Sequence, residues 1–590
     1  MNFYSSRLTY FTHQLEQLKK QYNTISFLRL VAVSGILFFG WQLLKTEGDF
    51  VYLPGIVIGI VAFAFLMKKH GTISKARTRA RALKDINIDE MTFLKKEGIP
   101  FENGEEFIDF HHTYSYDLDI FGNRSLFHNM NRTQTFKGKE KLASLLLNVL
   151  PQDDILKNQE AIKELSTKPE WRQEIMAMGK MNKDNATIYK KLIGWSKSNL
   201  KGMSKSVIIA AYAFPALLVI TLIAYFVTNN RSFLDITGYL FVFNLGFLST
   251  QFKLIKSEIA DTTEIHEIIH NYGLIIEQIE KESFTSDKLK GLQQNLVLKN
   301  HKAGEQIRRL SDLLSRMDTV NNLFAMILFN GAFLFHVHTL NTLLKWKKEH
   351  AEAISHWLDI IAEVEALNSL ANLYYNNPEF TFPSLNNDYK VSFTDVAHPL
   401  LNAKTRVGND VDFNPRFMIL TGSNMSGKST FLRSLGVNMV LAGVGASVCA
   451  AQANIHPLPV LVSMRLSDSL SDSESYFYAE IKRLKQIMDS LEEERAFVLL
   501  DEILRGTNSD DKQTGTIEVV KKMVARKAIG AIATHDIEVC NTTAQYPTDL
   551  RNSCFEAQII DNDLYFDYKL RDGICKNKSA TFLMEKMGVI

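Results

Sequence analysis

The sequence predicts a C-terminal α/β domain of the P-loop type, preceded by an all-α region and by two transmembrane helical hairpins. Three observations predict this architecture. A glycine-rich loop follows a short apolar run at residues 417–420, long stretches of the N-terminal half carry almost no charge, and residues 254–281 and 287–317 repeat apolar side chains at helical spacing. Strand-like runs begin near residue 385, which marks the start of the α/β domain.

Length, charge and cysteine usage set broad limits. A chain of 590 residues exceeds what one hydrophobic core usually serves, so we expect several folded units. The 67 basic and 65 acidic residues leave a formal charge of +2, which by itself favours neither nucleic acid nor an acidic partner. The four cysteines all lie in the last third and form no C-x-x-C pair, which fits a reducing compartment such as the cytosol.

Two apolar stretches near the N-terminus predict the first hairpin. Residues 30–44 and 50–67 are separated by a short polar turn, and Arg29 and Lys45 flank the first stretch at opposite interfaces. A basic run follows the second stretch and comprises Lys68, Lys69, Lys75, Arg77, Arg79, Arg81 and Lys84. Because positive residues collect on the cytoplasmic side of spans, both ends of this hairpin are predicted to be cytoplasmic.

A second hairpin is predicted in the middle of the chain. Residues 206–228 carry no charge, and residues 232–252 carry only Asp235. A further apolar segment, residues 319–344, contains asparagines and histidines that are costly in lipid. A fifth crossing would also carry the C-terminal domain out of the cytosol, so we interpret this segment as a buried soluble helix. The prediction is a multi-pass membrane protein with a cytoplasmic C-terminal domain.

These patterns divide the chain into five regions. One helical region lies between the two hairpins, and another follows the second hairpin. The periodicity after residue 253 predicts long, lever-like helices. The predicted regions are an N-terminal hairpin with its basic flank (1–85), a helical core (86–203), the second hairpin (204–253), a lever-like helical region (254–385) and the α/β domain (386–590).

The strongest chemical signal is the loop at residues 421–430, which reads Thr-Gly-Ser-Asn-Met-Ser-Gly-Lys-Ser-Thr. Its two glycines let backbone N–H groups point at phosphate oxygens, and the helix that follows adds a favourable dipole. Lys428 is expected to reach the β- and γ-phosphates of ATP, and Ser429 to offer a hydroxyl to Mg²⁺. The residues predicted to bind the nucleotide are Gly422, Ser423, Asn424, Met425, Ser426, Gly427, Lys428, Ser429 and Thr430.

Two further strands complete the predicted catalytic site. Residues 497–500 form an apolar run that ends in Asp501 and Glu502. Asp501 is expected to complete the Mg²⁺ shell, and Glu502 to polarise the attacking water. A second apolar run, residues 528–533, leads to His535, which suits contact with the γ-phosphate or the water. Together with Lys428, these residues predict an ATP hydrolase.

At these residues the sequence resembles the MutS family of mismatch-repair ATPases, a branch of the ABC-type P-loop enzymes. The resemblance rests on the loop at residues 421–430, on Asp-Glu-Ile-Leu-Arg-Gly-Thr at 501–507 and on Ala-Thr-His at 533–535. It covers roughly residues 110–200 and 350–590 and implies that the helical core and lever regions are MutS-like. It also implies a homodimer that forms through the ATPase domains.

The resemblance further implies that a signature segment of one subunit completes the nucleotide site of the other. Residues 471–480 occupy that place, and Ser475 and Glu480 match the family pattern. Ser473 and Glu474 replace the usual glycine and arginine before the serine. Mismatch readers of the family use a Phe-x-Glu motif, which does not occur in this sequence, so we expect a variant without the mismatch-recognition domain.

The sequence leaves several functions open. The ATPase is expected to drive conformational switching, either with DNA, mismatched or branched, in a mismatch-repair-related role at the membrane, or with protein or membrane partners instead. A minor alternative is a zinc metalloprotease, because residues 266–270 fit H-E-x-x-H with His266, Glu267 and His270. The basic run after residue 67 could contact DNA, but its place beside a span favours anionic lipid.

Overall fold

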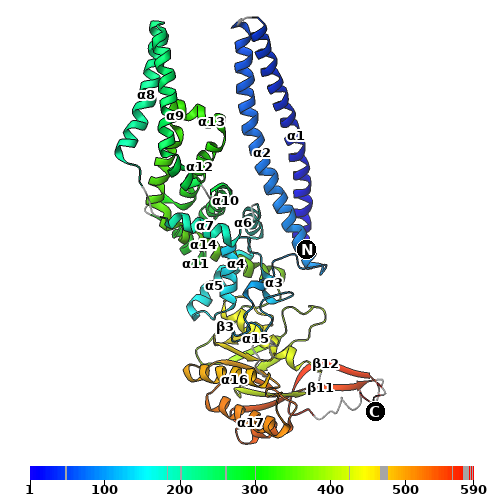
Figure 1. Ribbon diagram of the computed structural model, residues 1–590. Coiled ribbons are helices and arrows are strands. Elements are labelled where there is room, and N and C mark those ends of the chain that lie inside the picture. The colour runs from blue at the N-terminus through cyan, green and yellow to red at the C-terminus, as the bar shows by residue number, and fades with distance from the viewer. Residues whose placement is uncertain are drawn as a thin grey trace.

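The computed structural model describes residues 1–46, 50–181, 184–198, 202–259, 262–298, 301–423, 425–465, 476–560 and 563–575, together with residues 584, 587 and 589. The described chain is arranged in three tiers: helical hairpins at one end, a helical core in the middle and an α/β domain at the other end (Figure 1). The N-terminus lies at the base of the first hairpin, next to the core (Figure 1).

The first hairpin consists of two long helices, α1 (Asn2–Lys45) and α2 (Leu53–Leu94), that pack along each other. The apolar stretches at residues 30–44 and 50–67 form only the distal parts of these helices. Their polar flanks continue the same helices toward the core, because residues 2–29 and 68–94 contain no proline and a single glycine. Helix α2 therefore runs without a break through residue 85.

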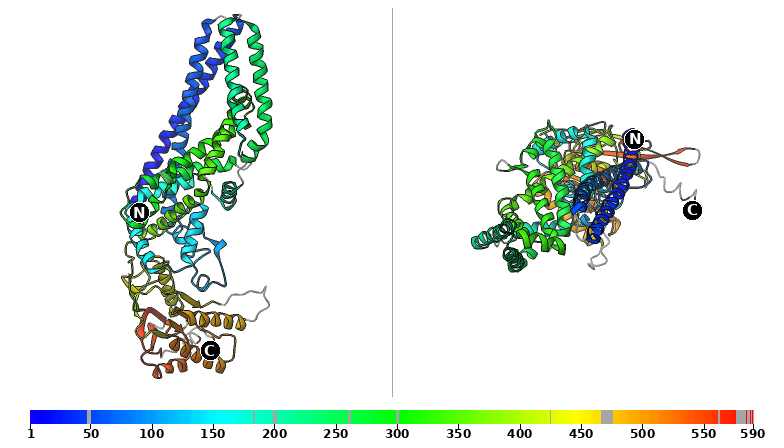
Figure 2. Two further views of the ribbon diagram at one scale, coloured as in Figure 1. Left: turned by 90° about the vertical axis from the view of Figure 1, so that its left-hand side faces the viewer. Right: turned by 90° about the horizontal axis from the view of Figure 1, so that it is seen from above.

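The second hairpin consists of α8 (Lys205–Thr228) and α9 (Arg231–Ile259), which coincide with the two predicted spans. Both hairpins point to the same end of the molecule (Figure 2). Among the described residues, four helices are long and apolar enough to cross a membrane by length and composition: α1, α2, α8 and α9. A bent helix pair after residue 322 passes the same test when it is counted as one span.

The prediction of one buried helix at residues 319–344 is wrong. This segment is broken into α13 (Leu323–Phe333) and α14 (Phe335–Asn376), which meet at an angle of 85°. Leu334 adopts a left-handed conformation with φ of 49°, which ends α13, and the Asn330 side chain accepts a hydrogen bond from the N–H of His336 in the first turn of α14. The second half of the segment is buried as predicted, whereas α13 exposes most of its apolar side chains.

The helical core is built around α14, which is buried along most of its 42 residues. Helices α4, α5, α6, α7, α10 and α12 pack against it, and α10 and α12 also pack closely against each other. The remaining elements of the core are α3 (Leu126–Met130), α4 (Phe136–Leu146), α5 (Gln152–Ser166), α6 (Pro169–Lys180), α7 (Ala186–Lys197), α10 (Thr262–Lys281), α11 (Asp287–Gln294), α12 (Ala303–Asp318) and the strand pair β1 (Val297–Leu298) and β2 (His301–Lys302).

The α/β domain contains a six-stranded sheet with the order β12-β11-β6-β10-β9-β8. All neighbours are parallel except the β11–β12 pair. Alternate residues of each buried strand face opposite sides: Leu499 and Ala531 pack in the cluster that includes α15, and Leu500 and Ile532 pack with α16 and α17. The elements are β6 (Phe417–Gly422), β8 (Val460–Ser463), β9 (Phe497–Asp501), β10 (Ile529–Ala533), β11 (Leu550–Ile560), β12 (Asp563–Asp572), α15 (Lys428–Gly443), α16 (Tyr476–Glu493), α17 (Ser509–Ala525) and α18 (Ile537–Asn541).

A second, four-stranded sheet has the order β3-β7-β4-β5 and lies on the side of the α/β domain that is nearer to the core (Figure 1). Its strands are β3 (Ser384–Leu385), β4 (Val391–Val396), β5 (Asn409–Asp412) and β7 (Gln452–Ile455). The core docks on the α/β domain through Asp119, whose carboxylate pairs with Arg465 at 2.5 Å and with Arg433 at 3.2 Å. Charged contacts of this kind fix orientation across a polar interface.

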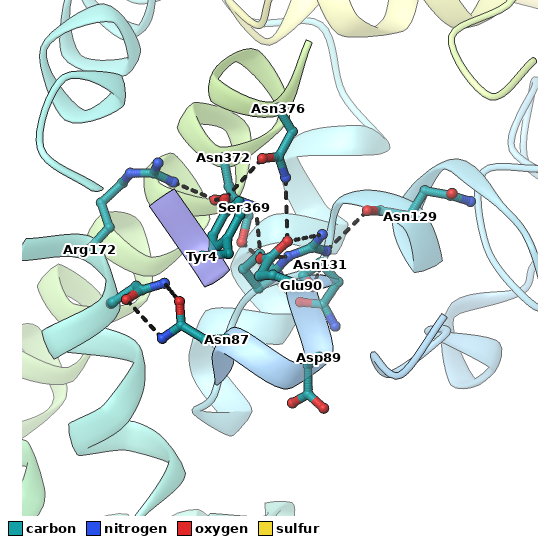
Figure 3. A network of polar contacts seen from close by, with 12 residues as sticks. Tyr4, Asn87, Asp89, Glu90, Asn129, Asn131, Arg172, Ser369, Asn372 and Asn376 are labelled. Carbon is teal, nitrogen blue, oxygen red and sulfur yellow. Dashed lines mark hydrogen bonds and ion pairs between the residues drawn. The ribbon is translucent and has the colours of Figure 1, made fainter. Parts of the chain in front are cut away.

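A buried polar network joins the first hairpin to the core (Figure 3). Glu90 of α2 forms an ion pair with Arg132 at 2.5 Å, and both side chains are 1% exposed. Asn372 of α14 donates a hydrogen bond to the same carboxylate, and the Arg172 guanidinium of α6 donates to the Asn372 side chain. The Tyr4 hydroxyl of α1 reaches the last turn of α14. Five segments of the chain therefore meet at this joint.

Candidate active site

The loop between β6 and α15 has the geometry expected of a phosphate-binding loop. Gly427 precedes the first residue of α15 with φ of 103°, a conformation that favours glycine, and a Cβ there would lie 3.0 Å from the Tyr568 ring. The hydroxyl groups of Ser423 and Ser426 are buried, and the described residues offer them no hydrogen-bond partner. Buried donors at a helix N-terminus fit a ligand with phosphate oxygens. Asn424 lies outside the described residues.

The other described residues that were predicted to bind the nucleotide lie in the loop or in the first turn of α15. Gly422 ends β6 and is in close contact with Phe555 of β11, so a side chain there would collide with the backbone. Met425 is exposed at the tip of the loop with φ of 70°. Ser429 and Thr430 lie exposed in the first turn of α15, beside the cavity described below.

Lys428 is buried and bends back over the loop. Its ammonium group donates hydrogen bonds to the carbonyl oxygens of Gly422 at 2.9 Å and Ser423 at 3.1 Å, and it lies 3.4 Å from His535 Nε2. Burial lowers the pKa of Lys428, while the negative charges of Glu502 and Asp501 oppose that shift. The ammonium group is therefore held over the loop by two carbonyl oxygens, which the phosphate oxygens of a nucleotide could replace.

Asp501 ends β9 next to the phosphate loop. Burial raises the pKa of Asp501, the neighbouring Ser429 hydroxyl opposes that shift, and Asp501 Oδ1 has no hydrogen-bond partner among the described residues. A hydroxyl and a partly unsatisfied buried carboxylate are ligands that Mg²⁺ prefers. Ser429 and Asp501 thus fit the metal role that the sequence predicted for them.

Glu502 and His535 form a close pair at the ends of neighbouring strands. His535 Nε2 lies 2.8 Å from Glu502 Oε1, and this hydrogen bond, together with the charges of Arg505 and Lys428, lowers the pKa of Glu502 to about 2. Glu502 itself has φ of 49°, and its N–H donates to the Ala533 carbonyl at 2.9 Å. The backbone at the ends of β9 and β10 therefore holds the Glu502 and His535 side chains next to each other.

A cavity of about 470 Å³ opens above these groups. It is lined by the loop residues and Glu502, and also by residues that the sequence did not single out. These additional lining residues include His398, Arg406, Phe555 and Tyr568. Burial lowers the pKa of His398 to about 4, so this ring is a neutral wall of the cavity at physiological pH. Arg505 is a further neighbour, because its guanidinium lies 3.5 Å from the Glu502 carboxylate.

The predicted signature segment is described only at its end. Ser475, with Ser473 and Glu474, lies outside the described residues. Glu480 starts the second turn of α16 and is buried, with its carboxylate accepting hydrogen bonds from the N–H groups of Leu504 at 2.6 Å and Arg505 at 3.2 Å. Its carboxylate therefore supports the turn that follows Asp501 and Glu502 in the same subunit.

The H-E-x-x-H pattern does not form a metal site in the structure. His266 and His270 lie on α10, and the described residues contain no group of three histidine, cysteine or acidic side chains that could hold a metal ion. His270 Nε2 lies 3.4 Å from the Lys75 ammonium of α2, and a neighbouring cation disfavours a metal ion. The alternative of a zinc metalloprotease is therefore not supported.

Comparison with known proteins agrees with this geometry. Residues 418–588 match the family described as MutS domain V. The chain is 27% identical over 247 residues to MutS protein homolog 4 of Homo sapiens, covering 39% of this chain and 25% of the human protein. It is 29% identical over 234 residues to DNA mismatch repair protein MutS of Thermotoga neapolitana, covering 38% of this chain and 28% of the bacterial protein. The match thus spans about a quarter of the length of these relatives.

Proposed function

We propose that this chain, a member of the MutS family through its C-terminal domain, is an ATPase that couples ATP binding and hydrolysis to conformational change at a membrane. The observation that carries the proposal is that Lys428 and Glu502 line one cavity beside the glycine-rich loop, with His535 2.8 Å from Glu502 and 3.4 Å from Lys428. Asp501 directly precedes Glu502 at the end of β9. These groups come from the ends of two parallel strands, β9 and β10, and from the start of α15, and the arrangement matches what phosphoryl transfer to water requires.

In this proposal the loop amides and Lys428 bind the terminal phosphates of ATP. Lys428 exchanges its hydrogen bonds to the two loop carbonyls for phosphate oxygens, which costs little because the ammonium is already desolvated. Ser429 and Asp501 would hold Mg²⁺, whose positive charge offsets the charge that develops on the phosphates. A water oxygen attacks the γ-phosphorus, and the bond between this phosphorus and the bridging oxygen breaks.

Glu502 is the residue that positions the water. With a pKa of about 2 the carboxylate is ionised but weakly basic while it is bound to His535. A γ-phosphate that draws His535 away would remove this hydrogen bond, and the pKa of Glu502 would return toward its ordinary value of 4.5. The pair therefore links arrival of the phosphate to activation of the base, and His535 is a positioning residue in both states.

The partners of this ATPase are proposed from two separate observations. The relatives that carry the printed name DNA mismatch repair protein MutS favour DNA, mismatched or branched, as a ligand. The four long apolar helices favour a membrane location with the ATPase domain in the cytoplasm, where the basic run of α2 faces anionic lipid. A second candidate function, action on protein or membrane partners without mismatch recognition, follows from these helices alone. A homodimer through the ATPase domains is part of both candidates.

ATP turnover by the purified full-length chain tests the enzymatic proposal. Glu502→Gln should lower kcat by roughly 10²- to 10⁴-fold and keep nucleotide binding, because the change removes the base and keeps the side-chain shape. Lys428→Ala should weaken nucleotide binding by roughly 10- to 100-fold, as expected for loss of charge-assisted hydrogen bonds. Glu538→Gln, an exposed change close in sequence to His535, is the matched control. Unchanged turnover in both site variants would contradict the proposal.

Binding of homoduplex, mismatched and branched DNA at several salt concentrations separates the two candidate functions. A DNA-binding protein loses affinity steeply as salt rises, because phosphate contacts release counterions. Preference for mismatched or branched DNA supports the first candidate. Lack of binding to all three substrates at low salt removes it and leaves the second.

A further inference from the structure

Helix α13 is an apolar helix without an apolar partner on one of its faces. Its 11 residues, Leu323–Phe333, carry no charge. Leu323, Phe324 and Leu328 are 63%, 88% and 61% exposed, and Phe329 and Phe333 are also exposed. Large apolar side chains exposed around most of a short helix mark a surface that another apolar phase covers.

The polar groups at the end of α13 are satisfied inside the protein. Asn330 and His336 are fully buried, and the Asn330 side chain bonds both the His336 backbone N–H at 2.9 Å and the ring Nδ1 at 2.7 Å. The Thr319 hydroxyl contacts the other ring nitrogen at 3.1 Å. A helix can end inside hydrocarbon only where its free backbone groups find such partners. This break therefore meets the requirement for a membrane-embedded helix end.

Helix α13 lies against α9 of the second hairpin (Figure 1). The Asn244 side chain, which is fully buried, donates a hydrogen bond to the Gly331 carbonyl at 2.8 Å, and a Cβ at Gly331 would collide with the Phe241 ring. Asn244 precedes Lys253, the first charge after the apolar stretch of α9, by nine residues or roughly 14 Å of helix. Half of a hydrocarbon layer is about 15 Å. The break thus lies within one leaflet.

We propose that α13 is a lipid-embedded half-helix that enters the cytoplasmic leaflet beside α9 and returns to the same side through α14. The inference rests on the membrane location proposed above. An 11-residue helix is roughly 16 Å long and cannot cross a layer of about 30 Å. Charged residues flank the embedded segment on both sides, Asp318 before it and Lys345 after it. Four crossings and one half-helix keep the ATPase domain in the cytoplasm.

Lipid is the occupant that the surroundings favour. The exposed face of α13 continues the apolar surface of the second hairpin, which exposes Ile220, Ile223 and Val242. A partner protein would be expected to meet some polar or charged rim on the helix, as at most protein interfaces, and α13 has no charged residue. A second copy of this chain or another protein remains an outcome of the test.

Site-directed labelling of the full chain in phosphatidylcholine–phosphatidylglycerol vesicles tests the proposal. Three native cysteines are buried, so a Cys575→Ser background leaves little reactive thiol. Phe324→Cys and, on the same face, Leu328→Cys carry an environment-sensitive fluorophore. Ile223→Cys in α8 reports the hairpin, and Leu156→Cys, on an exposed position of α5, reports water. Retained ATP binding shows that each labelled protein is folded.

The proposal predicts that labels at positions 324 and 328 emit at shorter wavelength than the label at 156. Nitroxides on lipid acyl chains should quench them, and aqueous iodide should not, as at position 223. Iodide quenching at 324 and 328 with lipid quenching at 223 would overturn the half-helix alone. Protection from both quenchers would show that protein covers α13 and would also overturn it. Iodide quenching at 223 would refute the membrane location itself, and the inference with it.

Discussion

Replacing Arg132 with methionine tests the joint between the first hairpin and the core. The change keeps much of the side-chain volume but leaves the buried Glu90 carboxylate, among the described residues, with only the amides of Asn372 and Asn376 as side-chain donors. Removing one partner of a buried ion pair costs about 3–5 kcal/mol. The guanidinium also stacks on Phe101 at 3.5 Å from the ring centroid, so loss of this contact acts in the same direction. We expect α1, α2 and the end of α14 to separate more readily.

Hydrogen–deuterium exchange of the full chain measures this effect locally. A change of 1.36 kcal/mol in the free energy of opening changes the exchange rate about tenfold. The expected loss of stability therefore speeds exchange by roughly 10²- to 10⁴-fold in peptides from residues 1–10, 84–94 and 366–376. Arg79→Met is the matched control, because the Arg79–Glu174 pair is 47% exposed on the arginine side and such pairs are worth about 1 kcal/mol or less. A second change, Glu90→Met, should restore protection in Arg132→Met by replacing the pair with apolar groups. Equal exchange in Arg132→Met and Arg79→Met would refute the reasoning.

Three further predictions concern the α/β domain. Gly427→Ala should lower the free energy of unfolding by about 1–2 kcal/mol and weaken ATP binding, because φ of 103° strains alanine and its Cβ meets Tyr568; thermal unfolding and nucleotide titration measure both. Glu480→Ala should cost about 1–3 kcal/mol and lower kcat, because the buried N–H of Leu504 and the part-buried N–H of Arg505 lose their acceptor; a turnover equal to wild type would contradict this role. The Glu502 carboxylate has a folded pKa of about 2 against 4.5, so its contribution to stability is complete above pH 4.5 and disappears as the pH falls through 2. Because the Glu502 and His535 side chains are 23% and 40% exposed, solvent reduces this contribution to about 1 kcal/mol, and His535→Ala should flatten the acid unfolding curve between these limits.

The convergence of the candidate catalytic residues was predictable because it follows from strand direction. Strands β6, β9 and β10 are parallel neighbours, so residues that follow their carboxyl ends must meet at one edge. The phosphate loop, Asp501, Glu502 and His535 are all such residues. Tyr568 reaches the same cavity from the antiparallel strand β12, and no local pattern marks that contact. Arg505 lies within residues 501–507, one of the segments that resemble the MutS family. Its pairing with Glu502 becomes visible only in the structure.

Predictions based on apolar runs were less complete, because hydropathy reports neither helix ends nor breaks. The apolar stretches located α8 and α9 well, since a turn with Asn229 in a left-handed conformation ends the first helix at the edge of the run. They missed the extension of α1 and α2, whose polar flanks have good helix formers and no breaker. They also missed the break at Leu334. That break depends on Asn330 and His336 bonding each other across the turn, a tertiary arrangement that spacing alone does not reveal.

The position of α14 explains how the proposed ATPase domain would act on both hairpins of the proposed membrane region. At its first residue α14 meets the end of α13, and in its last turns Asn372 and Asn376 bond Glu90 of the first hairpin. The same two asparagines line a cavity together with Leu401 and Arg406, and these two residues also line the nucleotide cavity. A shift of the segment that carries Leu401 and Arg406 therefore changes the surroundings of the joint directly, through packed side chains. Since α14 is a single helix, a displacement of its C-terminal end reaches α13 without passing through the central sheet.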